Sequence, residues 1–506
     1  MNIPLISLPL DKRIVTLIPD ARIVGDRLHV AHTPATTVLL KTIGITLPPA
    51  VTRYDYVGGK PFEVQKRTVE LLTQNPRAYV LNSFGTGKTK SALWSFDFLR
   101  SQNLAKRMLV VAPLSTLRFT WAREAFATVP HLTVNVLHGA GGAAKRLKLL
   151  AEPVDVYVIN PDGLGVIIDE VIKRTDIDVI CIDELATFRN RTIRTAHLKR
   201  IAQSKTIVWG MTGAPTPNHP TDVYHQSKII TPRTCPMSFV RFRDETMVKV
   251  GDFRWVPRPD ATEKAMQVLR PHVRYTLDDV TELPTYVSQY TEVPLSELQA
   301  TVYKEIKQHC YAMTKNKEIT TSNAAVAMIK LLQVSMGWVY GSDGTVIDLD
   351  GTPRLEALRD LIEAGDHKVL VFVPYKHALA GVYKFLTDAG IESAVVSGDT
   401  SARDRGEIFN LFQNTVKYKA LIAHPAVASH GLTLTAANTV VWFGPITSLE
   451  LYDQANARIR RVGQAQHQLF VHMHSTPIEK YVYRLLINKI INQDQLLRLL
   501  EEATEA

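Results

Sequence analysis

A short glycine-containing segment near residue 85 carries the clearest chemical signal in the sequence. It reads Asn82-Ser83-Phe84-Gly85-Thr86-Gly87-Lys88-Thr89 and lies between an apolar run at 78–81 and a stretch at 91–99 that we expect to be helical. Strand, glycine loop and helix can form a phosphate-binding loop, because glycine lets backbone N–H groups turn towards one point. Lys88 would reach the outer phosphates of a nucleotide, and the Thr89 hydroxyl would hold Mg²⁺. Asn82 departs from the general pattern, which has its first glycine there.

Two adjacent carboxylates, Asp183 and Glu184, follow the apolar run at 178–182. After a buried strand they can do separate work: Asp183 would hold Mg²⁺, usually through water, and Glu184 would polarise the attacking water. An acidic pair can also simply end a strand. Together with the phosphate loop, the pair points to nucleoside triphosphate hydrolysis.

A glutamine and an aromatic residue precede the loop. Gln65 can make a paired hydrogen bond to adenine, and Phe62 could pack nearby. Taken alone, Gln65 would be an unremarkable surface residue.

Strand and helix patterns alternate through both halves of the chain. In the first half, the apolar runs at 108–113, 154–159, 178–182 and 206–211 predict a parallel, doubly wound sheet, whose strand ends gather ligand groups. The second half repeats this pattern without a second phosphate loop, which suggests a lobe that closes over the nucleotide of the first. We expect an α/β fold, with lobes at 51–285 and 286–506.

Two arginines in the segment 454–464, Arg458 and Arg461, are candidates for completing the nucleotide site. They are three residues apart, so on a helix they would share a face. Guanidinium groups delivered across a cleft stabilise charge that develops on a γ-phosphate. The alternative is an arginine-rich surface helix.

The net charge of +10 favours a polyanionic partner. Residues 186–206 contain six Lys and Arg residues and no acidic residue. This composition fits either a solvated helical face or a contact with a nucleic-acid backbone. Residues 239–258 interleave arginines with aromatics, which predicts a hairpin. It could touch nucleic acid, but we favour a half-buried hairpin with a basic outer face.

The order of these motifs resembles that of a known family. The segments 83–89, 183–186 and 212–218 look like motifs I, II and III of superfamily-two helicases, and TGAPTPN at 212–218 is similar to the Swi/Snf-type branch of DNA translocases. The segment 454–464 is similar to motif VI, with Ala457 where glycine is usual. The segment 429–438 resembles motif V, with Ser429 and His430 as departures.

The resemblance, over roughly residues 55–490, implies two RecA-like lobes, ATP and Mg²⁺ as cofactors, and DNA as partner. The candidate DNA contacts are Ser115, Thr116, Arg118 and Arg194. We expect a monomeric DNA-dependent ATPase that moves on duplex or branched DNA. The alternatives are a strand-separating helicase, a non-catalytic nucleic-acid-binding module, and RNA as the partner. The compact second lobe favours a bacterial or phage member.

Residues 1–50 carry none of this chemistry. Short strands at 13–18 and 27–30 and a helix at 36–43 predict a small α+β appendage, either a recognition module or a cap, with a faint similarity to the HARP module of annealing helicases. Three widely spaced cysteines, a first segment unlike a signal peptide, and no apolar run near the roughly 20 residues that span a bilayer indicate a reducing, intracellular setting. For a bacterial or phage member we expect the cytoplasm rather than the nucleus.

Overall fold

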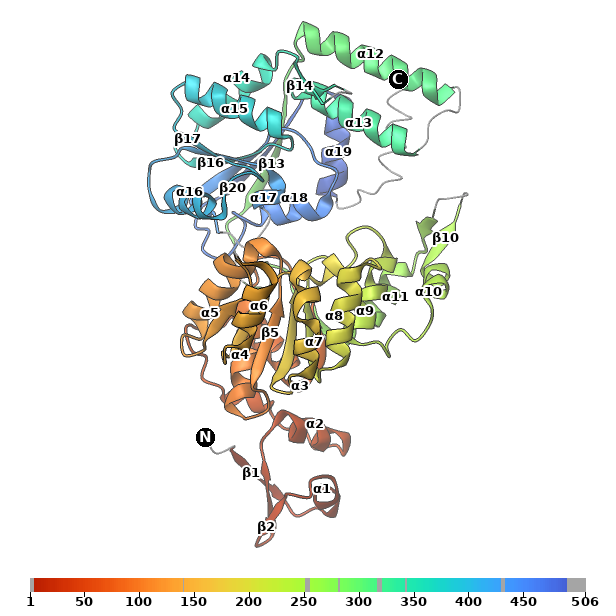
Figure 1. Ribbon diagram of the computed structural model, residues 1–506, viewed down its shortest axis with the longest axis vertical. Helices are drawn as coiled ribbons and strands as arrows, with labels where there is room; N and C mark the ends of the chain where they lie inside the picture. The colour runs from red at the N-terminus through yellow and green to blue at the C-terminus, as the bar shows by residue number, and fades with distance from the viewer. Residues whose placement is uncertain are drawn as a thin grey trace. The chain divides into compact units, whose positions relative to one another are not determined.

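The chain divides into two compact units, residues 1–281 and 282–506, each built around a parallel sheet (Figure 1). This computed structural model describes residues 4–139, 141–250, 255–280, 283–315, 321–341, 344–428 and 433–488. The two sheets and the helices that cover them confirm the predicted α/β class with two RecA-like lobes. In the described ranges, we find no helix that combines the length and apolar character needed to cross a membrane.

The sheet of the first unit has seven strands in the order β12-β4-β9-β8-β5-β7-β6, and all described pairings are parallel. The strands are β4 (Arg77–Val80), β5 (Arg107–Val111), β6 (Val134–Val136), β7 (Val156–Ile159), β8 (Ile177–Asp183), β9 (Ile207–Met211) and β12 (His272–Val273). Since successive side chains of a strand point to opposite faces of the sheet, each strand contributes residues to two cores, one on each face. In β8, Cys181 is buried in one core and Ile182 in the other.

Helices cover both faces of this sheet. One core contains residues of α3 (Glu63–Gln74), α4 (Lys88–Ser101) and α5 (Arg123–Thr128). The other contains residues of α6 (Gly142–Ala151), α7 (Leu164–Lys173), α8 (Ile193–Gln203), α9 (Val223–Ile230), α10 (Phe239–Thr246) and α11 (Ala261–Val268). Because helices cover both faces of the sheet, its strands have continuous apolar sequences.

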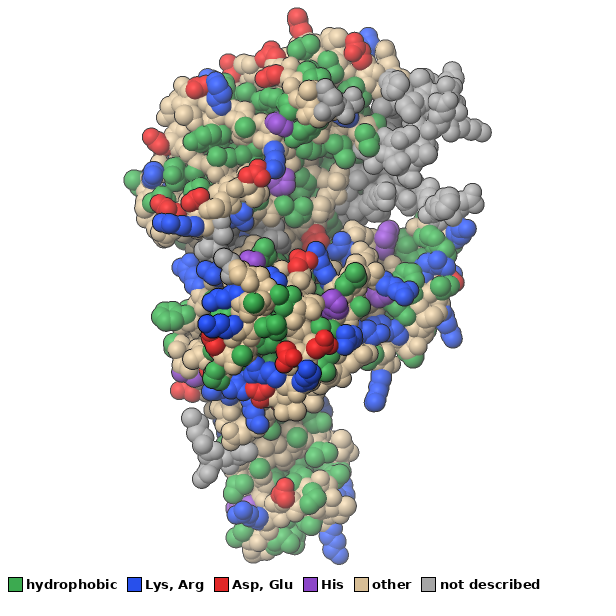
Figure 2. Space-filling view, in the orientation of Figure 1, with side chains coloured by type: hydrophobic (Ala, Val, Ile, Leu, Met, Phe, Trp, Pro, Cys, Tyr) green, Lys and Arg blue, Asp and Glu red, His purple; other side chains and the backbone are tan. Residues whose placement is uncertain are grey.

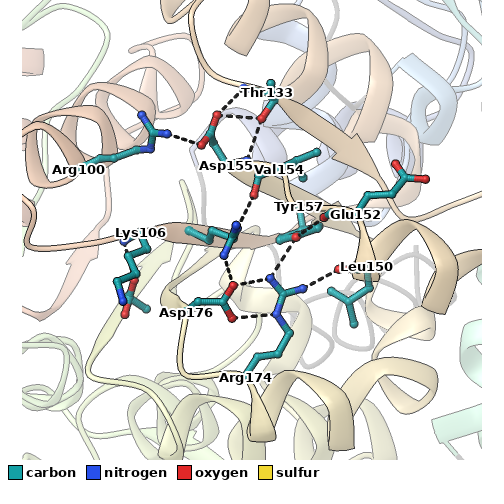
Figure 3. A network of polar contacts seen from close by, with 12 residues as sticks. Arg100, Lys106, Thr133, Leu150, Glu152, Val154, Asp155, Tyr157, Arg174 and Asp176 are labelled. Carbon is teal, nitrogen blue, oxygen red and sulfur yellow. Dashed lines mark hydrogen bonds and ion pairs between the residues drawn. The ribbon is translucent and has the colours of Figure 1, made fainter.

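A network of polar contacts ties together the amino-terminal ends of the strands (Figure 3). Asp176, just before β8, pairs with Arg107 at the start of β5 and with Arg174 at 2.7 Å. Asp155, just before β7, pairs with Arg100 at 2.5 Å and accepts the backbone N–H of Thr133 at 2.8 Å. These contacts fix the strand starts, and the opposite, carboxyl-terminal edge carries the candidate chemistry.

The predicted hairpin at 239–258 is wrong in its first half. Residues 239–246 form α10, because the Ser238 side chain caps its N-terminus by accepting the backbone N–H of Arg241. Only β10 (Met247–Lys249) and β11 (Trp255–Pro257) pair as a hairpin. The Arg243 guanidinium lies 3.9 Å from the ring centre of Trp255.

The N-terminal residues form a small antiparallel sheet, β1 (Leu5–Pro9), β3 (Arg27–Ala31) and β2 (Arg22–Val24), with α1 (Lys12–Leu17) and α2 (Pro34–Thr42). The strand predicted at 13–18 is wrong. The Asp11 side chain caps α1 by accepting the backbone N–H of Arg13 at 2.8 Å, which outweighs the strand propensity of the residues that follow. Leu8, Ile14, Leu28, Val30 and Leu40 form a separate small core.

The sheet of the second unit has six strands in the order β13-β20-β19-β16-β18-β17, again with parallel pairings throughout the described residues. The strands are β13 (Tyr286–Glu292), β16 (Lys368–Phe372), β17 (Ser393–Val396), β18 (Ala420–Ala423), β19 (Ala437–Trp442) and β20 (Gln468–His474), and a separate hairpin pairs β14 (Trp338–Tyr340) with β15 (Val346–Asp348). The helices are α12 (Glu297–Lys315), α13 (Thr321–Ser335), α14 (Thr352–Glu363), α15 (Lys376–Asp388), α16 (Ala402–Asn414), α17 (Pro425–Ala428), α18 (Leu449–Asn456) and α19 (Pro477–Ile487).

A buried ion pair joins two helices of this unit. Arg354 on α14 donates to both carboxylate oxygens of Glu479 on α19, each at 2.8 Å, and both side chains are at most 1% exposed. The same guanidinium donates to the carbonyl of Phe443 at 2.9 Å and to the hydroxyl of Ser475 at 2.6 Å. Removing one partner would leave the other buried without a counter-charge.

We therefore predict that Arg354→Ala lowers the opening free energy of the second unit by about 3–5 kcal/mol. Arg359→Ala, which removes an exposed pair with Asp360 on the same helix, should leave that free energy close to its wild-type value. Hydrogen–deuterium exchange of β16 and β19 measures both. Equal protection in the two variants would contradict a structural role for the pair.

Candidate nucleotide site

The glycine loop follows β4 and leads into α4, as its sequence predicts. Gly85 and Gly87 have φ values of +82° and +80°, which other residues rarely adopt. Gly87 is the N-cap of α4 and has no side chain to cover the free N–H groups of the first turn. The Lys88 ammonium donates to the carbonyls of Asn82 and Ser83 at 2.8 and 3.0 Å. Backbone N–H groups and this ammonium are the donors that a polyphosphate needs.

The departure at Asn82 has a structural explanation. Its side chain is 2% exposed and makes two hydrogen bonds that a glycine could not make. The amide nitrogen donates to the Thr68 hydroxyl of α3 at 3.1 Å, and the amide oxygen accepts the backbone N–H of Tyr275, beyond β12, at 3.0 Å. Asn82 therefore fastens the loop to the elements on both sides of it.

Gln65 is buried under the loop, at 3% exposure. Its amide oxygen accepts the backbone N–H of Phe62 at 2.9 Å, and its amide nitrogen donates to the carbonyl of Thr86 at 3.3 Å. A Cβ on Gly87 would collide with that nitrogen, so the loop packs closely on Gln65. Adenine recognition by Gln65 and Phe62 stays a prediction.

The two predicted carboxylates lie at the end of β8. The Trp121 indole N–H donates to Asp183 Oδ2 at 2.9 Å, and the backbone N–H of Glu184 donates to Asp183 Oδ1 at 3.1 Å. Burial raises the pKa of Asp183, while the Trp121 hydrogen bond and the Lys88 charge oppose that rise. Glu184 has a φ of +57°, a strained value for a non-glycine residue and one that recurs at active sites.

The segment after β9 contacts both the carboxylates and the loop. The Thr212 hydroxyl donates to Glu184 Oε1 at 3.1 Å. Gly213 lies against the ring of Phe84, since a Cβ there would be 3.0 Å from two ring atoms. The Phe84 ring centre is in turn 5.0 Å from the Lys88 ammonium. The structure therefore brings together the loop, the acidic pair and the segment 212–218.

Sequence reasoning missed two of these contacts. Trp121 is not among the predicted site residues, and Asn82 was treated only as a departure. A buried indole N–H needs a hydrogen-bond acceptor, so a partner for Trp121 could have been expected. Nothing in the sequence identifies that partner as Asp183.

The candidate DNA contacts differ in what their side chains do. Arg118 is exposed, and Ser115 is half-buried in the turn after β5. The Thr116 hydroxyl donates to the carbonyl of Pro113 at 2.8 Å, and the residue is 6% exposed. Arg194 pairs with Asp162 at 2.5 Å. Their contact with DNA stays a prediction.

In the second unit, the helical placement of Arg458 and Arg461 is wrong. Helix α18 ends at Asn456, and the two arginines lie in the turns that follow. Arg458 is 5% exposed, and its Nε donates to the carbonyl of Gln454 at 2.9 Å. Ala457 has a φ of −66°, so no glycine is required there. Ser429 and His430 lie outside the described residues.

Comparison with known families settles the class of this chain. The SNF2-related domain family matches residues 66–336, more than half of the chain, and the helicase conserved C-terminal domain family matches residues 353–463. The chain belongs to the SNF2-related family of superfamily-two helicases. This confirms the resemblance seen in the motifs.

Relatives agree with this assignment. Protein p41 of Acyrthosiphon pisum secondary endosymbiont phage 1 is 26% identical over 81% of this chain and 92% of its own length. The human DNA annealing helicase and endonuclease ZRANB3 is 23% identical over 78% of this chain, which spans only 36% of that protein. The solved structure of Saccharomyces cerevisiae Dbp5, bound to RNA and ADP BeF3, has a TM-score of 0.53 at 12% identity, covers 88% of this chain and 94% of its own, and supports the fold alone.

This SNF2-related chain is therefore an ATP-hydrolysing enzyme of the helicase or translocase type, as predicted. The roles of individual residues remain predictions, and the loop offers a direct test of them.

We predict that Gly87→Ala weakens ATP binding by more than tenfold, because the added methyl would push the buried Gln65 amide off the Thr86 carbonyl that it holds beneath the loop. The control is Gly44→Ala, at a φ of +84° with nothing within 4 Å of the added atom. It should lose about 1–2 kcal/mol of local stability and bind ATP normally. Equilibrium binding of a fluorescent ATP analogue measures both, and normal affinity in Gly87→Ala would contradict the assigned loop.

Proposed function

We propose that this SNF2-related enzyme uses ATP and Mg²⁺ to move along duplex or branched DNA. The observation that carries the proposal is the presence of unpaired cations at the sheet edge that also holds the nucleotide loop. Arg118 follows β5, and Arg191 follows β8. In the described residues of the chain neither forms an ion pair, so both are available to phosphates.

A wider basic surface supports this reading. Figure 2 shows several Lys and Arg side chains over the part of the first unit that carries α8 to α10. Lys199, Arg191 and Lys228 all lie close enough to lower the pKa of His225, after the larger effect of its burial. Such a concentration of like charge is unfavourable alone and is relieved by a polyanion.

The residues at the loop fit ATP and Mg²⁺, because they supply ammonium and N–H donors beside a hydroxyl and a carboxylate. Lys88 would hold the outer phosphates, and Thr89 and Asp183 would hold Mg²⁺, which neutralises charge on the leaving phosphate. Glu184 would orient the attacking water. Its hydrogen bond with Thr212 connects it to the segment 212–218. Arg458 and Arg461 would complete the site from the second unit.

Strand separation is the second candidate function. The hairpin of β10 and β11, with Arg243 packed on Trp255, is the feature that could separate the strands of a duplex.

The phage relative and the compact second unit fit an enzyme that works as a monomer in the cytoplasm of a bacterium or an infected host.

The test is steady-state ATP hydrolysis without nucleic acid and with single-stranded, duplex or forked DNA, or with RNA. We expect duplex or forked DNA to raise the rate at least tenfold. Lys88→Ala should abolish hydrolysis, while Lys90→Ala, which removes a half-buried cation paired with Glu124 from the same helix, should retain it.

Stimulation by single strands alone would favour the helicase reading. Stimulation by RNA at least equal to that by duplex DNA would overturn DNA as the partner. Binding should also fall steeply between about 50 and 200 mM salt, because phosphate contacts release counterions.

A further inference from the structure

We propose that Trp121 is a positioning residue that couples nucleic-acid contact at residues 115–118 to the orientation of the Asp183 carboxylate. The inference rests on the proposed function, because it assumes that DNA binds this segment. It adds a link between that contact and the metal-binding group, which neither the motifs nor the family assignment supplies.

The first observation is how the carboxylate is held. Asp183 Oδ1 is fixed by the N–H of the next residue in its own chain, at 3.1 Å. Asp183 Oδ2 is fixed by the Trp121 indole N–H, at 2.9 Å, which comes from a different element. A shift of the turn that carries Trp121 would therefore rotate the Asp183 carboxylate. The bond from the Glu184 N–H cannot do so, because Glu184 is the next residue and moves together with Asp183. Hydrogen bonds to a metal-binding carboxylate set its direction.

The second observation is the element that carries Trp121. It lies in a π-helical turn, Leu117–Ala122, which directly follows the turn Leu114–Thr116 at the end of β5. π-helical turns are rare, and they are found frequently at functional sites. Trp121 is 1% exposed and Leu114 is 53% exposed, so this short segment reaches from solvent to the carboxylate.

The third observation is the charge at the exposed end. Arg118 lies three residues before Trp121 and is exposed. Its charge lies near enough to His138 to lower the pKa of that imidazole, after the larger effects of burial and of Arg146. An exposed guanidinium suits a phosphate group. A phosphate that draws Arg118 outwards would displace the same turn that holds the indole.

A purely structural tryptophan does not need this arrangement. Burial accounts for the ring, but a phenylalanine would fill most of that volume without offering an N–H. The chain provides a matched control in Trp94, which is also 1% exposed, belongs to the same core, and donates its indole N–H to the carbonyl of Val57 at 2.9 Å. Trp94→Phe removes the same bond type without touching Asp183.

The experiment compares Trp121→Phe with Trp94→Phe in the full chain. It measures the Mg²⁺ concentration for half-maximal ATP hydrolysis and the ratio of rates with and without duplex DNA. Trp121→Phe should raise the Mg²⁺ midpoint about tenfold, as loss of an outer-shell partner typically does, and should bring the stimulation ratio close to one. Trp94→Phe should leave both quantities as in the wild type.

Equal behaviour of the two variants would overturn the proposal, and so would a shifted Mg²⁺ midpoint with full stimulation. Failure of the proposed function is seen separately, as absence of stimulation in the wild type. A second measurement is made on the wild-type protein. The indole N–H resonance of Trp121, assigned by its absence from the spectrum of Trp121→Phe or Trp121→His, should shift when duplex DNA is added without nucleotide. An unchanged resonance would contradict the coupling.

Discussion

The candidate chemistry of this protein depends on the parallel pairing of four neighbouring strands, β4, β9, β8 and β5. All four end at the same edge of the sheet, so the residues that follow each strand become neighbours of those that follow the next. Phe84 after β4 packs on Gly213 after β9. Thr212 after β9 bonds Glu184 after β8. Asp183 at the end of β8 accepts the N–H of Trp121, after β5.

The two edges of this sheet do different work. At the amino-terminal edge, ion pairs such as that between Arg100 and Asp155 fix where the strands begin. At the carboxyl-terminal edge lie the groups proposed to act on the nucleotide, such as the Lys88 ammonium, which donates to two carbonyls here and would turn to phosphates when ATP binds.

The sequence predicted the parallel sheets and the loop well, because apolar runs and glycine spacing are local signals with direct structural causes. It failed where one side chain decided the local structure. Asp11 turned a strand-like segment into α1, and Ser238 did the same for α10. The end of α18 at Asn456 likewise could not be predicted from the three-residue spacing of Arg458 and Arg461. Contacts between distant segments, such as those of Asn82, require the fold to be known first.

We propose that hydrolysis at this edge drives movement along duplex DNA. The most direct measurement is displacement of a third strand from a DNA triplex, with the duplex strands labelled in the same molecule. We expect that ATP, but not a non-hydrolysable analogue, releases the third strand and leaves the duplex paired. Hydrolysis stimulated by duplex DNA without release of the third strand would contradict it.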